Sequence, residues 1–170
     1  MSIIKKNLIL ISIFTLLSLA PTKAEELKKI GKFKDWQTMV LIEPAGTVCF
    51  AQSTPVLQAP KKNKRDARLF VTFRPNEKIS NEISTTAGYE FNKKNKVKAT
   101  SGKNKFELNI KQQGFAWIAD NKLEKKMIKV MKKGSRIMIE GHNEEGSHTI
   151  DHYSLLGFTK AYSAAKKACS

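Results

Sequence analysis

Residues 134–169 read GSRIMIEGHNEEGSHTIDHYSLLGFTKAYSAAKKAC, and the fold prediction starts from this segment. It predicts two strands, 135–141 and 149–155, joined by a polar turn at 143–147. A short helix over 158–168 follows. The apolar face of that helix consists of Phe158, Tyr162 and Ala165. The stretch therefore predicts a β-hairpin followed by a C-terminal helix that packs against a core.

The first 24 residues have the pattern of an export signal. Lys5 and Lys6 precede an apolar run at 8–20, and Thr22-Lys23-Ala24 provides small residues for cleavage after Ala24. The alternative is a membrane anchor, but the run is shorter than the roughly 20 residues that a spanning helix needs. We expect residues 25–170 to be the exported chain, without a transmembrane segment. The expected location is the periplasm, with the outer surface or secretion as further destinations.

The chain has two cysteines, Cys49 and Cys169. In an oxidising compartment an even pair predicts a disulfide, and each is the other's sole intrachain partner. A metal site is the weaker alternative, because zinc needs more ligands than two distant thiols. The bond would tie the C-terminal helix to an N-terminal strand.

Short strand-like segments fill the region before the hairpin. They are 36–42, 47–51, 69–73, 79–83, 96–100, 105–111 and 115–118. Segment 105–111 has the clearest alternation and predicts one strand with Phe106, Leu108 and Ile110 on one face. Residues 25–34 are interpreted as a charged lead-in. Turn signals separate the segments and no linker divides the chain. We predict one mainly β domain, an antiparallel β-sandwich of about eight strands with two short helices and one disulfide.

The first of those helices covers residues 121–133. Asn121 and Glu124 would form a capping box, and Gly134 would end the helix in a left-handed conformation. The predicted apolar stripe is Leu123, Met127, Val130 and Met131. The remaining positions include six lysines: Lys122, Lys125, Lys126, Lys129, Lys132 and Lys133. Burial of the stripe would present these lysines to solvent.

The charge balance indicates an anionic partner. The chain has 31 Lys and Arg against 15 Asp and Glu, a net charge of +16. Such a field favours anionic envelope components, and the six helix lysines are the candidate binding residues. The alternative is that the lysines only keep the protein soluble. A nucleic-acid partner is not expected. Just four of the basic residues are Arg, the side chain preferred for phosphate recognition, and the aromatic residues lie in predicted strands as core residues do, not as platforms for stacking bases.

Three histidines, His142, His148 and His152, lie close together in the sequence. Across the predicted hairpin His142 and His148 would face each other and, with Glu144 or Glu145, offer ligands for a divalent metal. Ordinary polar residues beside a hairpin tip are the alternative. The run DHYS at 151–154 contains catalytic residue types, but neighbours on a strand point to opposite faces. Without a hydrolase or phosphate-binding motif, we predict no catalytic site and no cofactor.

Several stretches together resemble the invasion-associated locus B family of exported proteins from Gram-negative bacteria. They are Asp35-Trp36 and the Cys49 region; RPNE at 74–77, NEIS at 81–84 and AGY at 87–89; MKKGS at 131–135; YSLLGFTKAY at 153–162; and AC at 168–169. The resemblance implies a β-sandwich protein without established enzymatic activity, named for a role in host-cell entry. The histidines and the abundance of lysine are not part of the family pattern.

The region from Arg74 onward has a second interpretation. Arg74 is placed to pair with Glu77 or Glu82, which would make these residues a structural ion pair at a turn. The alternative is a ligand-binding groove lined by Arg74, Asn81 and Glu82.

Together these observations predict an exported, non-enzymatic envelope protein that acts by binding an anionic envelope component or an envelope or host protein. An enzyme that uses His142, His148 and His152 is the first alternative. A structural or chaperone-like periplasmic factor is the second.

Overall fold

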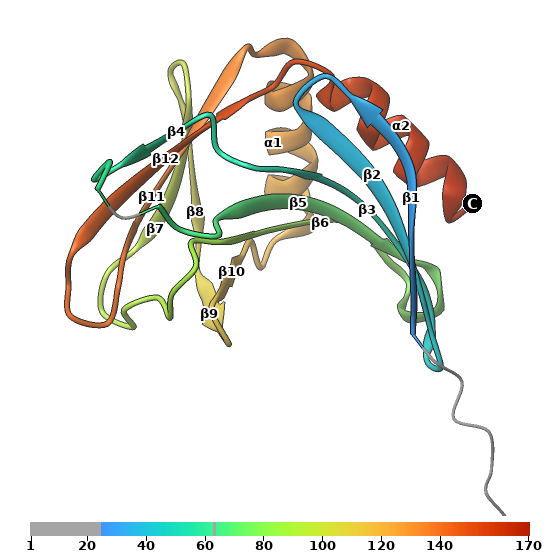
Figure 1. Ribbon diagram of the computed structural model, residues 1–170, viewed down its shortest axis with the longest axis horizontal. Coiled ribbons are helices and arrows are strands. Elements are labelled where there is room, and N and C mark those ends of the chain that lie inside the picture. The colour runs from blue at the N-terminus through green and yellow to red at the C-terminus, as the bar shows by residue number, and fades with distance from the viewer. Residues whose placement is uncertain (1–24, 63) are drawn as a thin grey trace, which may run out of the picture.

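Two antiparallel sheets form the framework of the protein in a computed structural model that describes residues 25–62 and 64–170 (Figure 1). The expected export signal, residues 1–24, lies outside these described residues. Within them, no helix is both long and apolar enough to cross a membrane.

The larger sheet has seven strands in the order β1-β2-β3-β5-β6-β10-β9. Their bounds are β1 Glu26–Phe33, β2 Trp36–Glu43, β3 Gly46–Ser53, β5 Arg68–Arg74, β6 Ile79–Thr86, β9 Ile110–Gln112 and β10 Phe115–Trp117. A short 3₁₀ turn, Pro75–Glu77, links β5 to β6.

The smaller sheet has five strands in the order β4-β12-β11-β7-β8. Their bounds are β4 Leu57–Ala59, β7 Val97–Ser101, β8 Asn104–Leu108, β11 Arg136–His142 and β12 His148–Ser154. The predicted sandwich class is confirmed. Its strands are more numerous than the expected eight because β1 and β4 were not predicted as strands and segment 105–111 is divided in two.

Both helices, α1 Asn121–Lys133 and α2 Phe158–Ala168, pack on the inner face of the seven-stranded sheet (Figure 1). Trp36 is fully buried at the centre of this layer. Its ring packs against Phe158 with centroids 4.8 Å apart, and its Nε1 donates a hydrogen bond to the Ser154 carbonyl at 2.9 Å. One residue of β2 thus holds β12 and α2 together.

The predicted disulfide is confirmed. Cys49 on β3 is bonded to Cys169, which directly follows α2. The closed loop spans 120 positions, so the bond joins the C-terminal helix to the first half of the large sheet.

Two strand predictions were wrong for the same kind of reason. The charged lead-in is the edge strand β1, and its lysines suit an edge that must not pair with another chain. The single strand at 105–111 is divided at Asn109 into β8 and β9, which belong to different sheets. Phe106 and Leu108 are buried, but Ile110 is 45% exposed. Both outcomes depend on pairing partners that are distant in sequence.

Helix α1 lies where it was predicted, but its details differ. Asp120, and not Asn121, caps it by accepting hydrogen bonds from the Lys122 and Leu123 backbone. Gly134 is extended, with φ of −86°, and not left-handed. The buried residues are Glu124, Met127, Ile128 and Met131, and Leu123 is exposed. The helix is therefore rotated relative to the predicted stripe.

Candidate functional site: a cationic pocket beside helix α1

The six predicted lysines are all exposed on α1. At about 100° per residue they divide into two groups around the helix. Lys122, Lys126, Lys129 and Lys133 follow one stripe, whereas Lys125 and Lys132 lie on an adjacent one. Only part of the predicted set can therefore face a single ligand.

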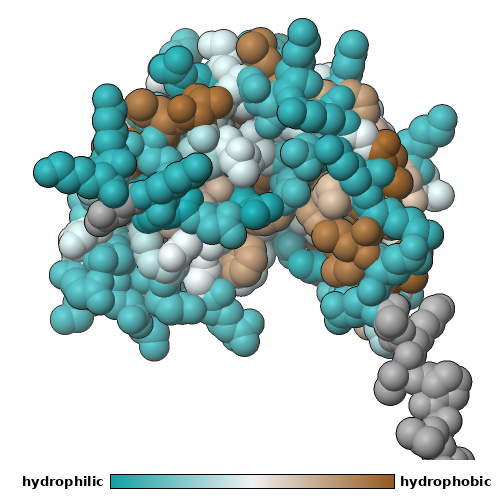
Figure 2. All heavy atoms as spheres, in the orientation of Figure 1, coloured by the Kyte–Doolittle hydropathy of each residue, from teal (hydrophilic) through white to brown (hydrophobic). Residues whose placement is uncertain are grey.

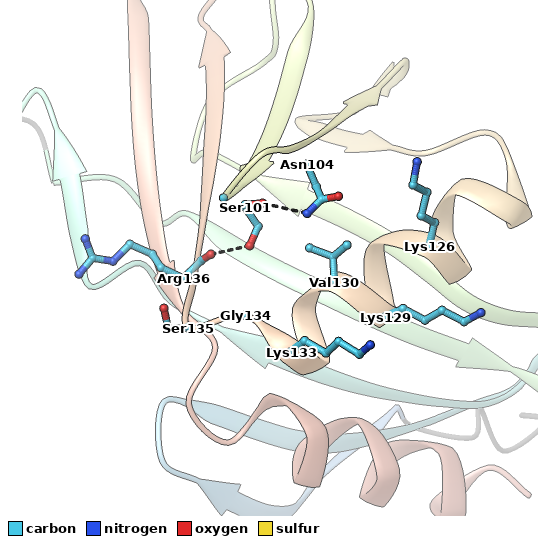
Figure 3. Close-up of a pocket in the computed structure, with 10 residues that line it drawn as sticks. Ser101, Asn104, Lys126, Lys129, Val130, Lys133, Gly134, Ser135 and Arg136 are labelled. Carbon is cyan, nitrogen blue, oxygen red and sulfur yellow. Dashed lines mark hydrogen bonds between the residues drawn. The ribbon is translucent and has the colours of Figure 1, made fainter.

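A pocket of about 580 Å³ lies beside this stripe, where α1 approaches the β7–β8 turn (Figure 3). Three lysines line it, Lys126, Lys129 and Lys133, together with the polar side chains of Ser101 and Asn104. Ser101 donates a hydrogen bond to the Arg136 carbonyl at 2.9 Å, and Asn104 donates to the Ser101 carbonyl at 3.3 Å. These bonds fix the floor of the pocket against β11.

The charge of this pocket is uncompensated. Its lining residues include no Asp or Glu. Within the part of the chain that the structure describes, none of its three lysines takes part in an ion pair, whereas Lys28 and Lys96 do. An anion placed here would meet several ammonium groups without competing carboxylates.

Arg136 also lines this pocket, and the sequence interpretation did not select it as a site residue. Its guanidinium extends away from α1 (Figure 3). The sequence feature that could have identified Arg136 is its position three residues after Lys133, at the start of β11. The other lysines contribute less: Lys132 lies 4.0 Å above the Tyr162 ring, and Lys122 and Lys125 are not among the lining residues.

The hairpin histidines have the predicted pairing. His142 lies directly opposite His148 and their rings stack with centroids 4.8 Å apart. The Nε2 atom of His148 also lies 3.5 Å from Oε2 of Glu140. His152 is further along the strand, opposite Met138. Burial and the neighbouring His148 lower the pKa of His142. Among the described residues, no three His, Cys, Asp or Glu side chains are arranged to hold a metal ion.

The Arg74 region forms the predicted ion pair and not a groove. Arg74 binds both carboxylate oxygens of Glu82, at 2.9 and 3.0 Å, and lies 3.9 Å from Glu77. Asn81 instead accepts a hydrogen bond from the Tyr162 hydroxyl, at a bulge where its φ is +69°. The structure therefore joins Arg74 to Glu82, whereas the Asn81 side chain is bonded to Tyr162 of α2.

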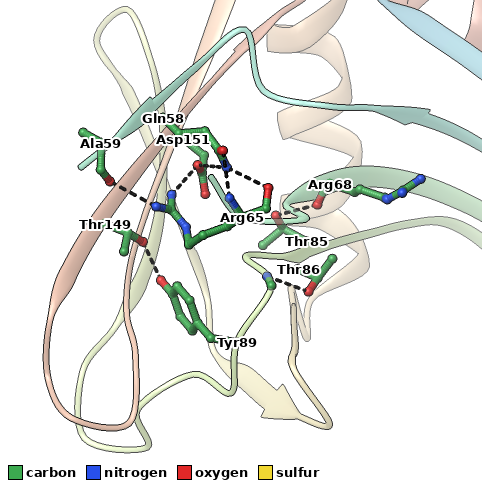
Figure 4. Close-up of polar contacts among 10 residues, drawn as sticks. Gln58, Ala59, Arg65, Arg68, Thr85, Thr86, Tyr89, Thr149 and Asp151 are labelled. Atoms are coloured by element: carbon green, nitrogen blue, oxygen red, sulfur yellow. Dashed lines mark hydrogen bonds and ion pairs between the residues drawn. The ribbon is translucent and has the colours of Figure 1, made fainter. Parts of the chain in front are cut away.

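A second polar cluster lies on the buried face of the small sheet, beside β12 (Figure 4). Arg65 and Asp151 pair at 2.6 Å, with side chains only 9% and 3% exposed, and Gln58 donates to the same carboxylate. Burial raises the pKa of Asp151, and the Gln58 hydrogen bond and the Arg65 charge oppose this. The cluster fixes the β4–β5 loop to β12. Asp151 therefore has a structural role. His152, its neighbour, lies on the opposite face of β12.

Glu124 is a buried acid on α1, 3% exposed. Its Oε1 accepts a hydrogen bond from the Ile83 backbone at 3.0 Å, which attaches the helix to β6. Burial raises the pKa of Glu124 to about 7, and the nearby Glu82 and Asp120 add to the effect. The sequence pattern predicted a capping box at Glu124. A local pattern cannot reveal that the Ile83 amide, on a different element, donates to this side chain.

Comparisons with known proteins agree with this architecture. Residues 36–166 match the profile of a family described as "Invasion associated locus B (IalB) protein". The crystal structure of invasion associated protein B from Bartonella henselae is similar, with a TM-score of 0.58 and 13% identity. The match covers 86% of this chain and 98% of that one, and it shows a shared fold. No curated protein matches the chain.

Proposed function

The chain belongs to the invasion associated locus B family, and from that premise we propose that it is an exported, non-enzymatic envelope protein that binds an anionic partner. The proposed location is the periplasm or the outer surface. One observation carries the binding proposal: Lys126, Lys129 and Lys133 line a pocket without any acidic residue.

The residues offered for enzymatic chemistry support a non-enzymatic role. Asp151 is paired with Arg65 in a buried cluster, and His142 is stacked on His148. A catalytic base needs to reach a substrate proton, and a carboxylate that is 3% exposed and already hydrogen-bonded is poorly placed for that.

The pocket also explains why the lysines need not act only as solubilising groups. Lysines scattered over a surface increase solubility wherever they lie. Here three of them occupy successive turns of one helix beside a concavity with the hydrogen-bonding groups of Ser101 and Asn104. This arrangement suits phosphate or carboxylate groups, which accept hydrogen bonds and carry negative charge.

The test is a triple variant, Lys126→Gln with Lys129→Gln and Lys133→Gln, which keeps helix propensity nearly constant. Binding to lipopolysaccharide and to inorganic polyphosphate is measured by titration as salt is raised. Each lysine near a dense anionic surface contributes about 1 kcal/mol, so removing three should reduce affinity on the order of 100-fold.

The matched control removes three exposed lysines elsewhere, Lys93→Gln with Lys94→Gln and Lys98→Gln. It lowers the net charge equally, so a general charge effect would reduce binding in both variants. Equal affinities in the two triple variants would contradict the proposed site. Circular dichroism checks that both remain folded.

A further inference from the structure

The cationic pocket continues into two more concavities on the same side of the molecule. Ser135 and Arg136 line both the first pocket and a second one of about 430 Å³. Leu156 lines the second pocket and a third one of about 610 Å³. A hydrogen bond from the Leu155 amide to the Ser135 carbonyl, 3.0 Å long, holds the α1–β11 and β12–α2 connections side by side. These connections lie along the upper side of Figure 1.

Two aliphatic side chains project between these pockets. Val56 is 56% exposed and Leu156 is 60% exposed, and both line the second pocket. Their backbones are fixed: the Val56 amide donates to the His152 carbonyl at 2.8 Å, and the Leu156 carbonyl accepts from the Asp35 amide at 3.3 Å. The side chains are therefore held outward by anchored backbone.

Cations flank the aliphatic pair on both sides. The three pocket lysines of α1 and Arg136 lie on one side. Lys32, Lys34 and Lys160 surround the third pocket on the other, around the half-buried Phe33. None of the three pockets is lined by Asp or Glu. Figure 2 shows hydrophobic residues exposed along the upper side, with hydrophilic side chains projecting beside them.

Gly157 makes the third pocket possible. Its φ is +92°, and a Cβ at this position would lie 1.8 Å from the Phe33 carbonyl oxygen. The β1–β2 turn, with Lys32 and Lys34, can therefore approach the first turn of α2. Only glycine permits both the backbone conformation and the contact.

We propose that this side of the protein docks on the surface of an anionic lipid bilayer. Val56 and Leu156, between the two groups of cations, would enter the boundary between headgroups and acyl chains. The proposal rests on the proposed function and names its partner as a lipid surface. Aliphatic side chains gain free energy by leaving water for acyl chains, while surrounding lysines contact headgroup phosphates. A soluble polyanion would use the cations but would leave the two aliphatic side chains in water.

The experiment compares two double variants after purification of the exported protein. One is Val56→Ser with Leu156→Ser. The control is Leu27→Ser with Ile110→Ser, which removes aliphatic side chains of similar exposure, 58% and 45%, from strands β1 and β9. Partitioning is measured on phosphatidylcholine vesicles with and without phosphatidylglycerol, and affinity is measured for inorganic polyphosphate.

We expect the Val56/Leu156 variant to partition about tenfold less onto vesicles that contain phosphatidylglycerol, with unchanged polyphosphate affinity. The control should behave as wild type in both assays. The triple lysine variant should lose both activities.

Wild-type partitioning by the Val56/Leu156 variant would overturn the bilayer proposal, and so would a loss confined to the Leu27/Ile110 control. In either case a triple lysine variant that no longer binds polyphosphate would leave the proposed function standing. If the triple variant retains polyphosphate binding, the proposed function fails and the bilayer proposal fails with it.

Discussion

Helices α1 and α2 lie on the same face of the large sheet but are attached to it by different chemistry. Helix α2 is held by the Cys49–Cys169 bond and by the buried Thr38 hydroxyl, which donates to the Ala161 carbonyl at 2.9 Å. Helix α1 has no covalent attachment. A buried carboxylate, Glu124, joins it to the Ile83 amide.

Because of this difference, the two helices should respond to different solution conditions although they share one core. A disulfide responds to reductant and is indifferent to protons over the physiological range. A buried carboxylate with a raised pKa responds to protons and is indifferent to reductant. We therefore expect the attachment of α2 to depend on redox conditions and that of α1 to depend on pH. The helix that carries the candidate binding lysines is the one expected to respond to pH.

The largest expected effect comes from removing the disulfide. Cys49→Ala should lower the free energy of unfolding by about 2–5 kcal/mol, because a crosslink over 120 positions restricts the unfolded chain. Urea unfolding measures the change. Hydrogen exchange should show the loss of protection mainly in α2.

Reduced wild type is the control, since it keeps both sulfur atoms and lacks only the bond. The reduced protein should unfold at a urea concentration close to that of the Cys49→Ala variant. Identical urea midpoints for oxidised and reduced protein would mean that noncovalent packing alone holds α2.

An intermediate effect is expected from Glu124 through pH. Its pKa of about 7 lies above the ordinary value of 4.5, so between those values the folded protein binds a proton that the unfolded chain has released. Stability should therefore fall as pH rises, by about 2–3 kcal/mol between pH 5 and pH 8. Glu124→Gln keeps an acceptor for the Ile83 amide and should remove most of this slope.

The matched control is Glu107→Gln, on an exposed pair with Lys96. It should retain the wild-type pH dependence. If Glu124→Gln and Glu107→Gln give the same slope between pH 5 and pH 8, the buried carboxylate does not determine how α1 responds to pH.

The smallest expected effect is at the contact between the two helices. Lys132 of α1 lies 4.0 Å above the ring of Tyr162 in α2. Lys132→Gln should cost about 0.5–1 kcal/mol of stability, the usual range for an exposed cation–π contact. Lys125→Gln, which removes an exposed lysine on the same side of α1, should cost less, and precise urea titrations can separate the two. Equal stabilities would show that the contact between Lys132 and Tyr162 does not stabilise the protein.

Features that depend on short-range order or on the number of cysteines could be predicted from the amino-acid sequence. The bounds of α2, the pairing of His142 with His148 and the mainly β class follow from local periodicity and turn residues. The disulfide followed from two cysteines in a chain that is expected to be exported.

Features that depend on partners distant in the chain could not be predicted and are seen in the folded structure alone. Glu124 fits a capping box in the sequence, but in the structure its carboxylate accepts a hydrogen bond from the amide of Ile83, 41 positions earlier. Ile110 alternates with Leu108 in sequence, yet the chain changes sheets between them. Arg136, Val56 and Leu156 meet at one side because loops from separate parts of the chain pack there. Hydrophobic periodicity specifies which face of an element is buried, but not which element covers it.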